Sequence, residues 1–271
     1  MAVVKGAMVI AFDFDPRLYE DSVRWIQSEC VAVDELHAAA GIARRDLDDA
    51  LAAGVIPRPT YQLYDCGIAS PVASLGVTGR LFGTYYGPAV VGWLRRASVY
   101  RARYGINRLP DRLREWVERD FREALLAQAE SASQFGWSHL FEGGNLVPHA
   151  FDEAAEKLWT EWLDGGWVVC LNEFSGYDVV SKDLELERIP ALAAAMKGQS
   201  GDGDDLVEAM LRFDRIVRPF APFERPMSSR RRVIDLVALE RGIAWPGVVG
   251  DETPAEVRLG SIEREDRLRC A

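Results

Sequence analysis

Apolar residues recur every three or four positions along most of this 271-residue chain, the spacing of helices that bury one face. Short apolar runs predict strands only within residues 1–15 and 167–171, while residues 61–91 are rich in glycine and tyrosine and follow no regular period. The predicted helices span residues 18–30, 33–40, 43–53, 92–134 with a break at Pro110, 152–163, 174–196 and 206–217. The pattern therefore predicts a mainly α fold with a few short strands.

Two short predicted helices near the N-terminus are joined by a tight turn. Gly41 in this turn can take the left-handed backbone conformation that other residues resist, and Gly54 ends the second helix. The apolar positions spaced to fill one small shared core are Leu36, Ile42, Leu47, Leu51 and Ile56. We therefore expect a compact head made of two helices.

The segment Val31–Tyr61, VAVDELHAAAGIARRDLDDALAAGVIPRPTY, resembles the N-terminal module of the mercury-resistance-regulator and excisionase superfamily. In that superfamily a short helix, a turn and a second helix lead into a wing. The resemblance implies a winged helix–turn–helix module, here packed with a larger helical domain. The expected domains are residues 1–65 with an extended lead, residues 66–243 with aromatic-rich loops, and a polar tail over residues 244–271.

Charge bears on whether this module binds DNA. The chain has a formal net charge of −10 and a pI near 5.0, so as a whole it is repelled by nucleic acid and by anionic membranes. Residues 18–60 contain four basic side chains and eight acidic ones. The residues that would contact DNA are Arg44, Arg45 and Arg58, with the protein binding as a homodimer. The acidic charge of the module disfavours DNA binding, which stays one of two open alternatives.

A second basic region could supply positive surface. Nine arginines lie within residues 92–122, and Arg108, Arg112, Arg119 and Arg122 recur at helical spacing. The alternative, which we favour, is a solvated helix face on which these arginines pair with nearby glutamates. Such pairs contribute about 0.3–0.5 kcal/mol each.

Cysteine spacing and hydropathy indicate the compartment. The four cysteines lie far apart, without the C-x-x-C pairs of a zinc ribbon or the density of a disulfide scaffold. No apolar run approaches the ~20 residues that a membrane span needs. The N-terminus also lacks the pattern of a signal peptide. We therefore expect a cytoplasmic protein that does not bind membranes.

The apolar run at residues 7–12 leads to Asp13 and Asp15, an arrangement that resembles the aspartate pair of haloacid-dehalogenase-type phosphatases. The acidic stretch at residues 200–210 resembles the magnesium loop of the same superfamily. That chemistry requires parallel strands alternating with helices, whereas the residues between these two stretches are mainly helical. We therefore interpret both stretches as solvated turns.

The segment PFAPFERPMSSRRRVIDL, residues 219–236, starts another predicted helix. Ser228 is a suitable N-cap, and arginines in the first turn oppose the helix dipole unless an anion or a carboxylate compensates. Ser228, Ser229 and Arg230 are therefore candidate anion-binding residues. The alternative, which we favour, is an internal ion pair between Arg230 or Arg225 and one of the many acidic side chains.

Few residues carry catalytic chemistry. His139 and Glu142 lie in the same aromatic loop, and Tyr177 lies further along the chain. These three are the candidate catalytic residues if the protein is an enzyme. No spacing matches a metal motif, so no metal site is predicted, and nothing indicates a cofactor. The aromatic side chains that could line a pocket for a flat ligand, or else complete a core, are Tyr85, Tyr86, Trp93, Trp137 and Trp167.

The N-terminal module, the segment WTEWLDGGWVVCL at residues 159–171 and the segment at residues 219–236 together resemble a bacterial family of uncharacterised proteins. The resemblance implies that these segments pack as one unit, and no function comes with it. The first hypothesis is a one-component transcription regulator whose helical domain senses a small molecule, an anion or a partner. The second is a small-molecule enzyme of bacterial specialised metabolism that keeps the module as a structural element. A binding role without chemistry is a third.

Overall fold

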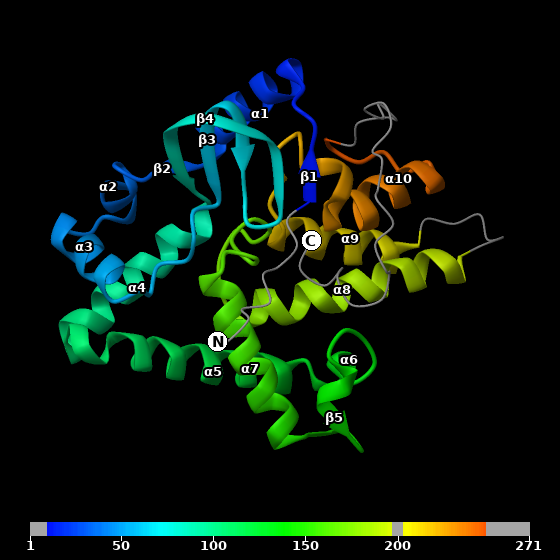
Figure 1. Cartoon of the computed structure of the whole chain (residues 1–271). Coiled ribbons are helices and arrows are strands. Elements are labelled where there is room, and N and C mark those ends of the chain that lie inside the picture. Colours follow the sequence, from blue (N-terminus) through cyan, green and yellow to red (C-terminus); the bar gives the residue numbers. More distant parts are fainter. Residues whose placement is uncertain (1–9, 197–202, 248–271) are drawn as a thin grey trace, which may run out of the picture.

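The computed structural model describes residues 10–196 and 203–247 (Figure 1). The described chain is mainly helical with a few short strands, as predicted. The α-helices are α1 (Pro16–Glu29), α2 (Leu36–Ala40), α3 (Arg44–Ala52), α4 (Pro88–Tyr104), α5 (Leu109–Ala127), α6 (Ala129–Ala132), α7 (Pro148–Leu163), α8 (Gly176–Ala195), α9 (Asp204–Ile216) and α10 (Leu236–Arg241). Shorter helical segments are η1 (Ile106–Arg108), η2 (Ser138–Leu140), η3 (Arg225–Met227) and the π-helical turn η4 (Arg231–Asp235).

Local signals explain where several helices begin. Proline lies in the first turn of α1, α4, α5 and α7. Backbone N–H groups in the first turn have no acceptor within the helix, so the absence of an N–H in proline costs no hydrogen bond there. Asp15 caps α1 by accepting hydrogen bonds from the N–H groups of Arg17 and Leu18. The predicted break at Pro110 is misplaced: α4 ends before Gly105, and Pro110 belongs to the start of α5.

The main sheet was missed by the sequence pattern. Its centre is an antiparallel hairpin of β3 (Tyr61–Ala69) and β4 (Ala73–Tyr86). Two short strands pair with the other edge of β4. The strand β1 (Ile10–Phe12) is parallel to the first residues of β4, and β2 (Val31–Ala32) is antiparallel to its last residues. A second, two-stranded sheet joins β5 (Phe141–Glu142) and β6 (Asn145–Leu146). The sheet is therefore mixed, unlike the parallel sheet that the phosphatase interpretation requires.

The predicted strand at residues 167–171 is wrong. Residues 166–170 form consecutive turns, and only Leu171 makes an isolated antiparallel bridge, to Val217. The run is apolar because it is buried, and burial alone does not distinguish a strand from a buried turn.

The sheet packs on both α1 and a segment from the C-terminal part of the chain. Ile26 of α1, Tyr61 and Leu63 of β3, and Phe223 belong to one hydrophobic core. The sheet and α1 form the upper part of the molecule in Figure 1, above helices α5, α7 and α8. The expected domain boundary at residue 65 therefore falls inside β3, in a strand that shares its core with a segment far along the chain.

The two helices α2 and α3, joined at Gly41, are called the head below. Gly41 has φ of 64°, the left-handed conformation that was expected of it. Leu36 and Leu47 are buried, and Ile42 and Ile56 pack against the same core. Leu51 is exposed, contrary to the prediction, because α3 turns Leu47 and Ala50 towards α4 and leaves Leu51 on its outer face.

Polar contacts fasten the head to α4. The guanidinium of Arg95 donates to the carbonyls of Ala39 and Ala40 at the end of α2. Arg101 forms ion pairs with Asp46, at 2.8 Å, and with Asp49. Two of the acidic residues of α3 therefore face the protein body and not a partner.

Candidate functional site

The first candidate site is a cleft of about 220 Å³ between α7, α8 and the loop around η2. It is called the tryptophan cleft below. Its lining residues are Trp137, His139, Ala150, Glu153, Ala154, Lys157, Leu158, Glu161, Trp167 and Asp183. Six of these recur at intervals of one, three or four residues on α7, so one face of this helix forms a wall of the cleft.

Trp137 is placed in the cleft by a glycine turn. Gly136 has φ of 56°, and a Cβ there would lie 2.9 Å from the Asp183 carbonyl oxygen, so only glycine brings this loop so close to α8. The Gly136 N–H also donates to Glu187 of α8 at 2.8 Å. Trp137 itself is only 8% exposed, and its ring packs edge-on against Phe121. Its position is therefore fixed by its neighbours.

Charged side chains surround the tryptophans. Lys157 pairs with Glu161 at 3.6 Å, one turn apart on α7. On α8, the buried Lys182 lies 3.9 Å from Asp183, with its ammonium 4.6 Å from the centroid of the Trp167 ring. The cleft thus combines an apolar floor with titratable groups, the combination typical of small-molecule sites.

The structure gathers only some of the predicted site residues. Trp137 and His139 line the cleft, their rings stacked with centroids 6.1 Å apart. Glu142 lies on β5 and Tyr177 at the start of α8, both exposed, and neither lines the cleft. The three candidate catalytic residues therefore do not share it.

Tyr85 and Tyr86, predicted as ligand contacts, end β4. Tyr86 is buried in the helical core, and burial raises the pKa of its hydroxyl above the usual value. Tyr85 packs partly buried against the core of the sheet. Neither lines the tryptophan cleft.

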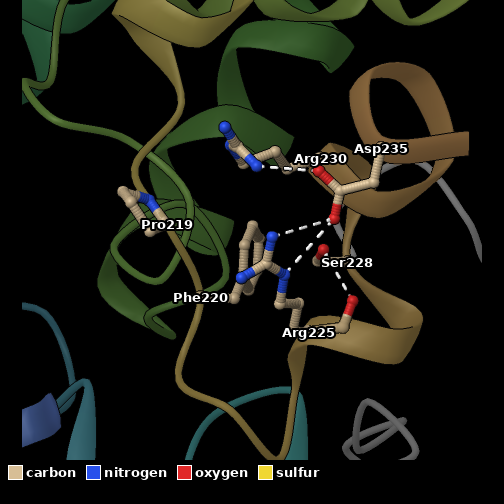
Figure 2. A pocket seen from close by; sticks show the side chains of 6 residues that line it. All are labelled: Pro219, Phe220, Arg225, Ser228, Arg230 and Asp235. Carbon is tan, nitrogen blue, oxygen red and sulfur yellow. Dashed lines mark hydrogen bonds and ion pairs between the residues drawn. The ribbon is translucent and has the colours of Figure 1, made fainter. Parts of the chain in front are cut away.

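The second candidate site is a cluster around Asp235, here called the arginine cluster. Figure 2 shows Arg225 and Arg230 pointing at the two oxygens of the fully buried Asp235 carboxylate. The distances are 3.2 Å for Arg225 Nη2 and 2.8 Å for Arg230 Nη1. Arg230 also binds Asp214 at 2.8 Å. This is the internal ion pair considered as the alternative for this segment.

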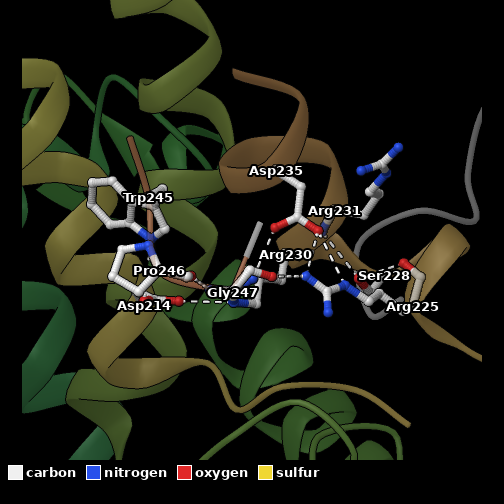
Figure 3. Close-up of polar contacts among 9 residues, drawn as sticks. All are labelled: Asp214, Arg225, Ser228, Arg230, Arg231, Asp235, Trp245, Pro246 and Gly247. Carbon is white, nitrogen blue, oxygen red and sulfur yellow. Dashed lines mark hydrogen bonds and ion pairs between the residues drawn. The ribbon is translucent and has the colours of Figure 1, made fainter. Parts of the chain in front are cut away.

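The arginine cluster also holds the first residues of the expected tail. Figure 3 shows the chain from Trp245 to Gly247 lying across the cluster. The carbonyl of Pro246 accepts from Arg230, that of Gly247 accepts from Arg225, and the Trp245 indole donates to Asp214. The rest of that tail, residues 248–271, lies outside the described residues.

Two of the three candidate anion-binding residues, Ser228 and Arg230, have partners inside the protein, whereas the buried Ser229 hydroxyl has no hydrogen-bond partner in the described part of the chain. Ser228 Oγ accepts from the N–H of Arg231 and donates to the carbonyl of Arg225, and Ser229 is buried. The cavity beside them measures about 20 Å³, room for roughly one water molecule. Anion binding here stays a prediction, and it would require Arg230 to leave a carboxylate.

A buried carboxylate joins the sheet to the C-terminal part of the chain. Glu224 is fully buried and accepts a hydrogen bond from Tyr61 at 2.7 Å and one from Ser70 in the turn of the β3–β4 hairpin. Burial raises the pKa of Glu224 from 4.5 to about 7, against the opposing effect of these hydrogen bonds and of the Arg218 guanidinium. The hairpin turn is therefore tied to the body and does not project as a free wing.

We expect Glu224 to make the stability of the protein decrease with rising pH. Because its pKa is about 7 in the folded chain and near 4.5 unfolded, its contribution is full below pH 4.5 and is lost as pH rises through 7. The slope it adds is at most about 1.4 kcal/mol per pH unit. Glu224→Gln should remove it while the amide keeps hydrogen-bonding to Tyr61 and Ser70. Urea unfolding of both proteins between pH 5 and 8 measures the difference, and parallel curves would contradict the assignment.

The predicted DNA-contacting arginines are paired with acids. The three arginines are exposed, and such surface pairs contribute little to stability but cancel charge; the acid of one pair, Asp49, is shared with Arg101. The three pairs are Arg44–Asp48 at 3.1 Å, Arg45–Asp49 at 3.8 Å and Arg58–Asp164 at 3.4 Å. Two of the four arginines of the basic stripe are paired in the same way, Arg112 with Glu115 and Arg122 with Asp152.

Sequence reasoning singled out the two tryptophans but missed the charged residues of the cleft. Glu153, Lys157 and Glu161 recur every four residues on one face of α7, a signal that reads equally well as a solvated helix face. Glu224 belongs to the segment at residues 219–236, and its sequence context predicted no role for it. No group of three or more His, Cys, Asp or Glu side chains within the described ranges is arranged to hold a metal ion.

Comparison with known proteins identifies one similar family. Residues 113–240, just under half of the chain, match a family of unknown function, DUF6058. No curated protein and no solved structure matches the chain. In the part of the chain that the structure describes, no helix is long and apolar enough to cross a membrane. The matched residues contain both the tryptophan cleft and the arginine cluster but not the head, so the similarity to DUF6058 is carried by the helical part of the protein.

Proposed function

We propose that the protein binds a small organic molecule in the tryptophan cleft. The observation that carries the proposal is the cleft itself: about 220 Å³, with two nearly buried tryptophans in its lining and titratable side chains beside them. A cavity of about 150 Å³ holds a molecule the size of benzene. The cleft therefore has room for a ligand of roughly amino-acid size.

The cleft and the head are connected by two packed helices, which supports a sensing role. Trp159 and Trp162 of α7 pack on Trp93 of α4, with ring centroids 6.1 and 5.3 Å apart. The same helix, α4, holds the head through Arg95 and Arg101. A ligand that moved α7 would thus act on the helix that carries the head, as a one-component regulator requires.

Blocking the cleft tests ligand binding. A ligand that binds the folded state raises the melting temperature by mass action. We expect hits from a library of small metabolites to stabilise the wild type but not Ala154→Trp, whose indole would fill the cleft. Ala102→Trp, at an exposed position of α4, is the control and should respond like the wild type. Hits that stabilise all three proteins equally would place binding elsewhere, and the absence of hits would refute the proposal.

DNA binding by the head is the second candidate function. The order α2, left-handed turn, α3 and hairpin supports it, since this is the order of a winged helix–turn–helix module. The paired charges of α3 predict few phosphate contacts and hence a shallow dependence of affinity on salt. Mobility shift on DNA upstream of its own gene, between 50 and about 200 mM salt, tests this. No retention at the lowest salt would exclude the head as a DNA-binding element.

A further inference from the structure

We infer that the ligand of the tryptophan cleft is a small organic cation, such as an amine or a quaternary ammonium compound. The inference rests on the proposed function and names the class of molecule that the cleft takes. It follows from the charges of the lining, from the aromatic floor and from the size of the cleft, which are independent features.

The lining of the cleft is acidic. Glu153, Glu161 and Asp183 contribute three carboxylates, and Lys157 is the lysine among the lining residues. Glu161 already has Lys157 as a partner and Asp183 has Lys182, so their charges are largely compensated. Glu153 is exposed on α7 and forms no salt bridge with any residue of the described chain. It therefore leaves one negative charge at the rim, available to a cation.

The aromatic side chains of the lining suit a cation as well. The electron-rich face of an indole attracts ammonium groups, and tryptophan is the strongest of the aromatic side chains in this respect. One such cation–π contact is already present within the protein: the buried Lys182 ammonium lies 4.6 Å from the centroid of the Trp167 ring. The second tryptophan, Trp137, is 8% exposed, with its ring stacked on His139 and packed edge-on against Phe121, so it offers a cation only the small part of its surface that lines the cleft.

Size limits the cation to a small one. A volume of about 220 Å³ accommodates on the order of ten non-hydrogen atoms, by comparison with the benzene-sized cavity above. Choline and tetramethylammonium fall within this limit. A polyamine chain or a nucleotide does not fit without extending into solvent.

Matched probes separate charge from shape. We propose calorimetric titration of the full-length protein with choline, with its uncharged isostere 3,3-dimethyl-1-butanol, and with benzoate as a small anion. A cation–π contribution of the usual size predicts choline affinity roughly tenfold above that of the isostere. Glu153→Gln should weaken choline binding several-fold and leave the isostere unchanged. Glu123→Gln, at an exposed position of α5, is the control and should change neither.

The outcomes distinguish this inference from the proposed function. If the isostere binds as tightly as choline, or if benzoate binds better, the cleft selects by shape or for anions and the cation assignment is overturned. If Glu153→Gln leaves choline affinity unchanged, the same conclusion follows. If no probe and no library compound binds in a manner that Ala154→Trp abolishes, the proposed function fails together with the inference.

Discussion

Replacing Trp93 with alanine is expected to lower the free energy of unfolding by about 3–5 kcal/mol, a large part of the total stability of a domain. Trp93 is 2% exposed and lies at the centre of an aromatic cluster. Its ring contacts are with Trp116, Trp159, Trp162 and Phe174, at centroid separations of 5.3 to 6.1 Å. Removing the indole leaves a cavity between three helices that the surrounding rings cannot fill without moving.

The Trp93 indole also makes a hydrogen bond that reaches the end of the head. Its N–H donates to the carbonyl of Val55 at 2.6 Å, in a buried position. Trp93→Phe keeps a ring but leaves this carbonyl without its donor, and should cost about 1–3 kcal/mol.

Urea unfolding measures both variants of Trp93. The control is Val99→Ala on the same helix, because Val99 is 64% exposed and its change should stay within about 0.5 kcal/mol. A loss below 1 kcal/mol for Trp93→Ala would mean that α4 does not hold the helical core together.

Replacing Asp235 with alanine is the second change with a large expected effect. Its carboxylate is fully buried and is shared by Arg225 and Arg230. Taking away one partner of a fully buried ion pair typically costs about 3–5 kcal/mol, and we expect the lower end of this range because the Arg225 side chain is 33% exposed and can be solvated. Arg230 would keep Asp214, whereas Arg225 would lose the carboxylate that orders it.

The matched control for Asp235 is an exposed ion pair. Asp164→Ala removes the partner of Arg58 at the surface and should cost less than about 1 kcal/mol. Chemical denaturation of the two variants compares them directly. Equal losses would show that the arginine cluster behaves as a surface network, despite its burial.

The helices could be predicted because their signals are local. In α7, the buried Ala155, Leu158 and Trp162 recur every three or four residues, and Pro148 marks the first turn. The prediction began this helix at residue 152, four positions late, since the residues before Asp152 read as part of an aromatic loop. The periodicity of apolar residues predicts that a helix is present, whereas the position of its ends depends on single residues.

The β3–β4 hairpin could not be found in the same way. Its pairing shifts register after Leu63, after Tyr64 and after Cys66, so inward and outward positions do not alternate regularly. Glycines at positions 76, 79 and 83 of β4 further hide the strand pattern. Val77 even has φ of 79°, which no β-propensity predicts for a branched residue.

The candidate sites depend on contacts between distant parts of the chain. Glu224 meets Tyr61 across 163 positions, and the cleft joins the loop at Trp137 with α7 and Asp183 of α8. Neither contact can be predicted from the spacing of these residues in the sequence, because only the tertiary fold brings them together. The tryptophans themselves were candidates for lining a pocket, although such aromatic side chains more often complete a core.

Fluorine NMR of protein labelled with 5-fluorotryptophan tests the central claim, ligand binding in the tryptophan cleft, most directly. Resonances are assigned by single tryptophan-to-phenylalanine variants, and the protein is titrated with choline and with the strongest library compound. The account predicts saturable shifts of the Trp137 and Trp167 resonances, with that of Trp25, which packs on Tyr61 beside the sheet, unchanged. Shifts that leave Trp137 and Trp167 unaffected, at ligand concentrations that saturate binding, would contradict it.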